Sequence, residues 1–173
     1  MRIKILTLAA AVVAAGLLAS ALPAQDEKKA KCIVAGKEVT ITDKTNSLLV
    51  NGEKVYFCCA NCPKAFAGNP EKFVTKAGNC PVNKAGAAKV AKESRTVINN
   101  GVFYACCAGC PAALRKEPAK FIKELSDPVT RKTFALKADS PRIDVKGQIY
   151  LFSSEDCKAE FEKDPAKYVL EYR

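Results

Sequence analysis

Three stretches of the chain place short apolar runs on either side of a turn. They read SLLVNGEKVYFC from Ser47, RTVINNGVFYACC from Arg95 and RIDVKGQIYLFS from Arg142. Runs rich in Val, Ile, Tyr and Phe that flank a glycine turn are typical of β-hairpins. We therefore predict a hairpin in each stretch. Because the glycine lies one position later in the second stretch than in the others, we expect the register of that hairpin to differ locally.

After each hairpin the apolar positions change to a helical spacing. In the first case Cys62, Phe66 and Phe73 mark one side of a helical segment. Residues 68–70 interrupt this segment, and Pro70 restarts it as a first-turn residue. A short turn, such as CIVAGK from Cys32, precedes each hairpin. The expected order is therefore an opening turn, a hairpin and short helices, which predicts an α+β protein.

This order recurs three times. When Cys62, Cys110 and Cys157 are aligned, three further sets of positions fall into register without gaps: Phe66 with Leu114 and Phe161, Pro70 with Pro118 and Pro165, and Phe73 with Phe121 and Tyr168. Self-similarity at a fixed period is the signature of a repeated structural unit. The chain is therefore predicted to contain three tandem small units, at residues 32–77, 78–125 and 126–173, whose aromatic residues form the core.

The residues before the first unit have the pattern of an export signal. Arg2 and Lys4 precede an apolar run that ends in small residues and Pro23. This pattern predicts a signal peptide over residues 1–24, cleaved after Ala21 or Ala24, followed by a linker over residues 25–31. The expected location is the periplasm or the exterior. Membrane attachment is expected only if the apolar run stays uncleaved as an anchor.

The net positive charge of the chain adds little to the prediction of its function. The sequence has 28 Lys and Arg against 18 Asp and Glu, and loss of Arg2 and Lys4 would lower the net charge from +10 to +8. Such a balance favours nucleic acid as a partner in a cytosolic protein, but export argues against it. Because the lysines are scattered singly, we interpret them as a solvated surface, with an acidic partner or anionic surface as the alternative.

The cysteines carry the candidate chemistry. Nine cysteines and no histidine are present, so a metal site must rest on thiolates. The first two units share the spacing C-x25-C-x3-C, and we predict these residues as metal ligands: Cys32, Cys58 and Cys62, then Cys80, Cys106 and Cys110. The last of each set enters a helix, whose N-terminus favours a thiolate.

Three thiolates suit a soft ion such as Cu(I), or Zn²⁺ with an exchangeable fourth position. About two ions per chain are therefore expected. Cys59 and Cys107 are possible extra ligands. Neighbours on a helix point about 100° apart, so Cys58 and Cys59 can bind one ion only if a non-helical bend separates them.

Two other uses of the cysteines stay open. Export permits disulfides, and a bridge from Cys32 to Cys58 or Cys62 would close a long loop in a disulfide-stapled interaction module without metal. The C-x-x-C pairs that end at Cys62 and Cys110 could support redox chemistry, although a unit of this size lacks the βαβ context of that motif. No carboxylate pair, phosphate-binding glycine loop or Ser/His/Asp set is visible, so we predict that the protein is not an enzyme.

The units resemble YHS and TRASH domains, treble-clef-like modules of proteins that traffic, resist or sense heavy metals. The resemblance rests on CPV at 80–82, VNGEKVYFCCANC at 50–62 and the motif F…NPEKF at 66–73. It implies treble-clef-like units and a role in heavy-metal buffering, delivery or resistance, with a periplasmic metal-handling protein as a possible partner. The first cysteine spacing is longer than in the TRASH pattern, and Ala35 and Asn83 replace the second cysteine of the opening knuckle.

The third unit lacks the cysteine set. Asp127, Ser153 and Ser154 occupy the positions of cysteines, and only Cys157 is left, whereas the aromatic and proline framework persists. This indicates a degenerate, capping unit without a metal site. We interpret Cys157 as a buried small apolar residue, or else as a thiol for dimerisation.

Overall fold

The structure is a computed structural model that describes residues 28–173. The predicted signal peptide and the first part of the linker lie outside the described residues. The last linker residues do not form a linker, because β1 (Lys29–Lys31) pairs antiparallel with β2 (Glu38–Thr40), so the first unit begins before Cys32. In the part of the chain that is described, no helix has the length and apolarity to cross a membrane.

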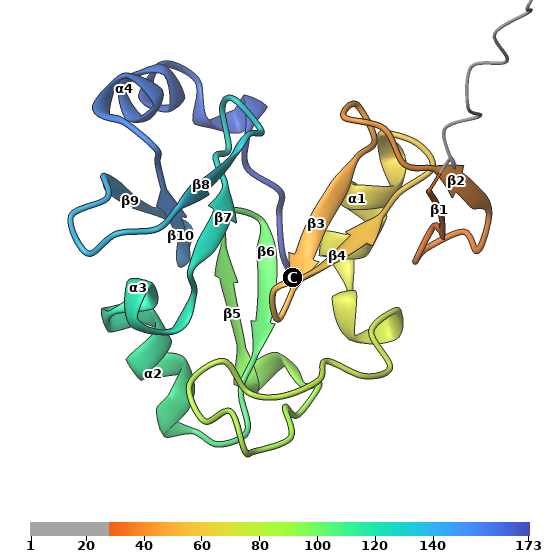
Figure 1. The fold of residues 1–173 in the computed structure, drawn as a ribbon, viewed down its shortest axis with the longest axis horizontal. Coiled ribbons are helices and arrows are strands. Elements are labelled where there is room, and N and C mark those ends of the chain that lie inside the picture. The colour runs from red at the N-terminus through yellow and green to blue at the C-terminus, as the bar shows by residue number, and fades with distance from the viewer. Residues whose placement is uncertain (1–27) are drawn as a thin grey trace, which may run out of the picture.

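Three β-hairpins lie along the chain where the apolar runs predict them (Figure 1). They are β3 (Ser47–Val50) with β4 (Glu53–Tyr56), β5 (Arg95–Ile98) with β6 (Gly101–Tyr104), and β9 (Arg142–Val145) with β10 (Gln148–Leu151). Each pair is antiparallel. Together with the helices described next, they confirm the predicted α+β class.

A helix follows each hairpin, and a second helical turn follows the helix. The pairs are α1 (Asn61–Gly68) with η1 (Pro70–Lys72), α2 (Gly109–Lys116) with α3 (Pro118–Phe121), and α4 (Glu155–Lys163) with η3 (Pro165–Lys167). A further short 3-10 helix, η2 (Lys92–Ser94), precedes β5. Each second turn begins with proline, whose fixed φ suits a first-turn position, as predicted.

The opening turn of each unit is flanked by β-pairing that the sequence analysis did not predict. The first turn lies between β1 and β2, and the third lies between β7 (Glu124–Ser126) and β8 (Thr133–Ala135). In the second unit a single bridge joins Asn79 to Ala87. These ladders close a tight loop that starts at the first ligand position. There the N–H of Cys32 donates to the carbonyl of Lys37 at 2.8 Å, and that of Cys80 to the carbonyl of Gly86 at 2.8 Å.

The expected difference in hairpin register was wrong. All three hairpins have two-residue turns with the same pairing, in which Ser47 faces Tyr56, Arg95 faces Tyr104 and Arg142 faces Leu151. Asn100, with φ of 60°, takes the turn position that glycine fills in the other hairpins. Asparagine tolerates this left-handed conformation, so the glycine is not needed there. Gly101 is instead the first residue of β6.

The hairpins join into one six-stranded sheet of order β4-β3-β6-β5-β10-β9 (Figure 1). Neighbouring hairpins meet through parallel contacts, with Val50 opposite Val102 and Ile98 opposite Ile149. In both junctions the first strand of one hairpin pairs with the second strand of the next. The units are therefore arranged in a row by one repeated contact.

The core follows the same repetition. The central helix residues Phe66, Leu114 and Phe161 are all fully buried. In the first unit Phe57 meets Phe66 edge-on at 5.6 Å between ring centroids. Val102 and Tyr104 of the second unit also join the apolar cluster around Phe66. The cluster around Leu114 likewise includes Ile149 and Leu151 of the third unit, so the apolar core is shared across both junctions.

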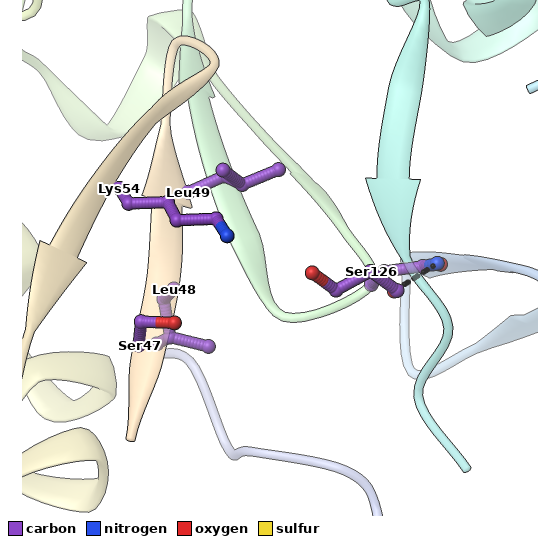
Figure 2. Close-up of a pocket in the computed structure, with 6 residues that line it drawn as sticks. Ser47, Leu48, Leu49, Lys54 and Ser126 are labelled. Carbon is purple, nitrogen blue, oxygen red and sulfur yellow. Dashed lines mark hydrogen bonds between the residues drawn. The ribbon is translucent and has the colours of Figure 1, made fainter. Parts of the chain in front are cut away.

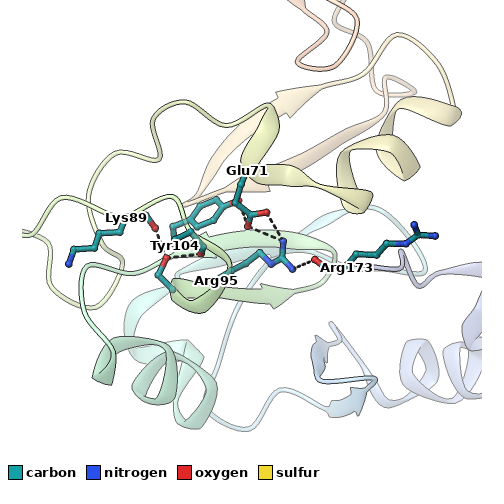
Figure 3. Close-up of polar contacts among 7 residues, drawn as sticks. Glu71, Lys89, Arg95, Tyr104 and Arg173 are labelled. Atoms are coloured by element: carbon teal, nitrogen blue, oxygen red, sulfur yellow. Dashed lines mark hydrogen bonds and ion pairs between the residues drawn. The ribbon is translucent and has the colours of Figure 1, made fainter.

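A partly buried polar network also crosses the first junction (Figure 3). The guanidinium of Arg95 on β5 donates to both carboxylate oxygens of Glu71 on η1, at 2.9 and 3.0 Å. The hydroxyl of Tyr104 donates to the same carboxylate at 3.1 Å, and Arg95 also reaches the carbonyl of Arg173 at 2.6 Å. Burial and the charge of Glu71 raise the pKa of Tyr104. The network therefore links the first unit, the second unit and the final residues.

Candidate metal centre

Each predicted triad of cysteines is brought together from three separate segments. Cys32 and Cys80 start the opening turns, Cys58 and Cys106 follow the hairpins, and Cys62 and Cys110 lie in the first turns of α1 and α2. Within each triad the three Sγ atoms lie within 4.8 Å of one another. The two groups could each hold a metal ion. All nine cysteines are free thiols in the structure.

The spacing of two thiols in each triad matches that of metal ligands. Cys58 Sγ lies 3.7 Å from Cys62 Sγ, and Cys106 Sγ lies 3.8 Å from Cys110 Sγ. Two thiolates bound at about 2.3 Å in a tetrahedral site are about 3.8 Å apart. The backbone therefore already holds these sulfurs at a distance at which one ion can touch both.

The possible extra ligands also lie close to the triads. Cys59 Sγ is 3.4 Å from Cys62 Sγ, and Cys107 Sγ is 3.1 Å from Cys110 Sγ. The bend that the sequence requires is present, because residues 57–60 between β4 and α1 are not helical. Both extra thiols are exposed. Their separations are shorter than the edge of a tetrahedral thiolate site, so each would have to move outward to share the ion.

Backbone N–H groups stabilise the first thiol of each triad as a thiolate. The N–H of Ala35 donates to Cys32 Sγ at 3.4 Å, and the N–H of Asn83 donates to Cys80 Sγ at 3.4 Å. Burial raises the pKa of Cys32, but the backbone hydrogen bonds from Ala35 and its neighbours outweigh burial and lower this pKa to about 7. The pKa of Cys80 is lowered for the same reason. Ala35 and Asn83, which stand where the family pattern has a second cysteine, thus still stabilise the thiolate through their backbone N–H groups.

The pKa values of the two helix thiols are shifted in the opposite direction, upward. Contact with the thiol of Cys59, together with burial, raises the pKa of Cys62 to about 12. Contact with Cys107 and burial raise the pKa of Cys110 to about 12 as well. An ion that binds either triad must therefore displace the proton from the helix thiol of that triad, which makes binding pH-dependent.

Gly86 is a site residue that the sequence analysis missed. A Cβ at this position would lie 3.0 Å from Cys106 Sγ and 3.1 Å from Cys106 Cβ. A larger residue at this position would therefore push the Cys106 side chain away from its place against the opening loop of the second unit. No pattern in the single sequence pointed to this contact, because the unit-one turn carries its glycine at Gly36.

In the third unit hydrogen bonds fill the place of the cysteine triad. The buried Asp127 carboxylate accepts from the N–H groups of Val129 and Thr130 at 2.9 and 3.0 Å. It also accepts from both the N–H and the hydroxyl of Ser153 at 2.9 and 2.8 Å. Cys157, which is half-buried, lies 3.5 Å from the Ser153 hydroxyl. The carboxylate is therefore fully engaged by the protein itself.

Two cavities of the described residues lie apart from the thiols. One holds only about 20 Å³ and is lined by residues of all three units, which include Leu49, Asn99 and Ser126 (Figure 2). The other holds about 630 Å³ beside the final residues and is lined by Lys64, Lys146 and Arg173, among others. Neither is lined by a cysteine. The candidate chemistry therefore lies with the thiol clusters.

Comparison with protein families places the resemblance on one unit. The model of the YHS domain matches residues 125–172. Comparisons with curated proteins and with solved structures found no match. The matched residues coincide with the unit in which Asp127 and Ser153 stand in cysteine positions, so the match rests on the framework and not on the thiols. Residues 125–172 are therefore similar to a YHS domain.

Proposed function

We propose that this protein binds two soft or borderline metal ions, copper or zinc, one in each cysteine triad. The observation that carries the proposal is the convergence of three thiols within 4.8 Å in each of the first two units. The donor set contains only sulfur, which favours Cu(I) or Zn²⁺ over hard cations. The YHS match to the third unit supports heavy-metal handling as the context.

The proposed scaffold is three treble-clef-like units, of which the third caps the array without binding an ion. The proposed role is buffering, delivery or resistance outside the cytoplasm, without catalysis, and a periplasmic metal-handling protein is the proposed recipient. The partly exposed thiols of each site support transfer, because Cys58 and Cys59 are open to an incoming ligand while Cys32 and Cys62 are buried.

Anaerobic titration of the reduced protein with Cu(I) or Zn²⁺ tests the proposal. Saturation is expected at about two equivalents per chain, since only two triads are complete. Replacement of Cys32, Cys58 or Cys62 by Ser should abolish tight binding in the first unit and leave one equivalent. Cys59→Ser serves as the matched control and should cause a smaller loss.

Three results would contradict this assignment. Saturation at three equivalents would give the third unit a site, and equal losses for Cys59→Ser and Cys62→Ser would indicate a four-thiolate site. Disulfide-linked peptides at full occupancy in protein from the periplasm, with Cys32 joined to Cys58 or Cys62, would favour the disulfide-stapled interaction module instead.

A further inference from the structure

The side chain of Asn51 crosses from the first unit into the second. Asn51 is the first turn residue of the β3–β4 hairpin, with φ of 48°. Its amide Nδ2 donates to the carbonyl of Asn79 at 3.0 Å and to that of Tyr104 at 3.1 Å, and its Oδ1 accepts the N–H of Tyr104 at 2.6 Å. Asn79 directly precedes Cys80, and Tyr104 lies two residues before Cys106. One side chain therefore joins the two segments that carry these thiols.

The first unit makes the corresponding connection within itself. There the N–H of Ile33, next to Cys32, donates to the carbonyl of Tyr56 at 3.2 Å. The equivalent of Ile33 in the second unit is Pro81, which has no N–H. The carbonyl of Tyr104, the equivalent of Tyr56, accepts from Asn51 instead. A residue of the first unit thus adds a connection between the opening turn and the hairpin of the second unit, beside the backbone hydrogen bond from the N–H of Lys89 to the carbonyl of Ala105 at 2.9 Å.

We infer that Asn51 is a positioning residue for the second metal site, so that a residue of the first unit sets the affinity of the second site. This inference rests on the proposed function. Alteration of a group that holds metal ligands in place typically lowers metal affinity by about 10- to 100-fold. We expect an effect of this size on the second site. Asn51 touches no ion and acts only through the segments of Cys80 and Cys106.

The turn of the second hairpin supplies a matched control, because it makes the same contacts with the third unit. Asn99 occupies the same turn position, with φ of 48°. It donates to the carbonyls of Ser126 and Leu151 at 3.0 and 2.7 Å and accepts the N–H of Leu151 at 2.7 Å. The unit that it contacts has no cysteine triad. Asn99→Asp therefore removes the same hydrogen bonds and adds the same charge without a dependent metal site.

The test uses the full mature chain loaded with Cd²⁺ under anaerobic, reducing conditions. Cadmium NMR should give one resonance per site, assigned with Cys62→Ser and Cys110→Ser. A competing chelator then removes the ion from each site. In Asn51→Asp, which keeps the turn conformation but loses the amide donors, the second site should release Cd²⁺ at about 10- to 100-fold lower chelator concentration, with a shifted resonance. The first site should be unchanged.

Asn99→Asp should leave both resonances and both affinities unchanged while lowering stability to a similar extent. Asn51→Gly, which accepts the positive φ and removes only the side chain, gives a second test if the carboxylate prevents folding. Unchanged affinity of the second site in both Asn51 variants would overturn the inference, as would equal effects of Asn51→Asp and Asn99→Asp on that site. Absence of both resonances in the parent chain would overturn the proposed function, and the inference with it.

Discussion

Cys32, Cys80 and Asp127 occupy the same place in the three units and differ in the atom that accepts hydrogen bonds. In each unit the donor is the backbone N–H of the residue three positions later in the chain. It donates to Sγ in the first two units and to a carboxylate oxygen in the third. The loop thus presents the same donors to each residue. A thiolate can still bind an ion in this setting, whereas the Asp127 carboxylate uses its oxygens on Ser153, Val129 and Thr130.

We expect Asp127→Asn to destabilise the protein by about 2 kcal/mol at neutral pH, because an amide has one acceptor oxygen and its NH₂ would face the donors of Ser153. Burial raises the pKa of Asp127, but the hydrogen bonds outweigh it and lower this pKa below its ordinary value. The stabilisation is therefore present above the unfolded-state pKa of about 3.9 and is lost as pH falls through the lower folded-state value.

Denaturant unfolding of the parent protein and of Asp127→Asn at several pH values measures the difference in their free energies of unfolding. This difference should become smaller as the solution becomes acidic. Metal release in acid affects both proteins, so the difference reports on the carboxylate. The exposed Asp139→Asn is the control and should change stability little. A gap that stays constant through acid pH would contradict the assigned role.

At the scale of the elements, the hairpin turns explain why the middle hairpin keeps its register. Asn99 and Asn100 both have positive φ, and Gly101 is displaced into β6, where it lies against β3 of the first unit. A Cβ on Gly101 would lie 3.1 Å from Leu49 Cβ and within 3.2 Å of two backbone carbonyl oxygens. The glycine is therefore required by the close approach of two strands and not by the turn.

Gly101→Ala should lower the free energy of unfolding by about 1 to 3 kcal/mol, because the carbonyl oxygens of β3 and β5 cannot move away from the new methyl group. Gly68→Ala is the control, since nothing lies within 4 Å of its added Cβ at the end of α1. That change should be neutral or stabilise by up to about 1 kcal/mol. Denaturant midpoints of the two variants give the comparison, and equal midpoints would contradict the strand-contact explanation.

At the scale of the whole molecule, the shared sheet makes the units interdependent. The six-stranded sheet, the apolar clusters and the Glu71–Arg95 pair all cross unit boundaries. Each unit has a small core of its own, and a metal site absent from the unfolded chain adds its binding free energy to folding. Ion binding in one unit is therefore expected to stabilise the others.

The metal-loaded protein should accordingly melt in one transition, and a strong chelator under reducing conditions should lower the midpoint by about 15 to 30 °C for two sites filled far above their dissociation constants. Calorimetry measures both the midpoint and the number of transitions, and added Zn²⁺ should restore the midpoint. A protein held by disulfides would respond to reductant alone and ignore the chelator. Three separate transitions would contradict the interdependence of the units.

The sequence predicts well what repeats within a unit. The spacing of Cys32, Cys58 and Cys62 brings three thiols together, and the proline and aromatic positions predict the broken helices. The ladders β1–β2 and β7–β8 were not predicted, because strands of three residues are too short to show a period. The strand order and the crossing of Asn51 depend on contacts between units, which no local pattern reports.

The parallel junction between hairpins gives the molecule two unlike ends. At one end lies β4, a second hairpin strand, and its counterparts β6 and β10 pair with the preceding hairpin. At the other end lies β9, a first hairpin strand, and its counterparts β3 and β5 pair with the following hairpin. At the β9 end Lys146 replaces the asparagine of the other turns, and Arg142 pairs with Asp144 along the strand. Charged edge residues discourage strand addition. Lys146 also lacks the amide group through which Asn51 and Asn99 both donate to and accept from the next hairpin, so the β9 edge is less suited than the other hairpins to receive a further unit.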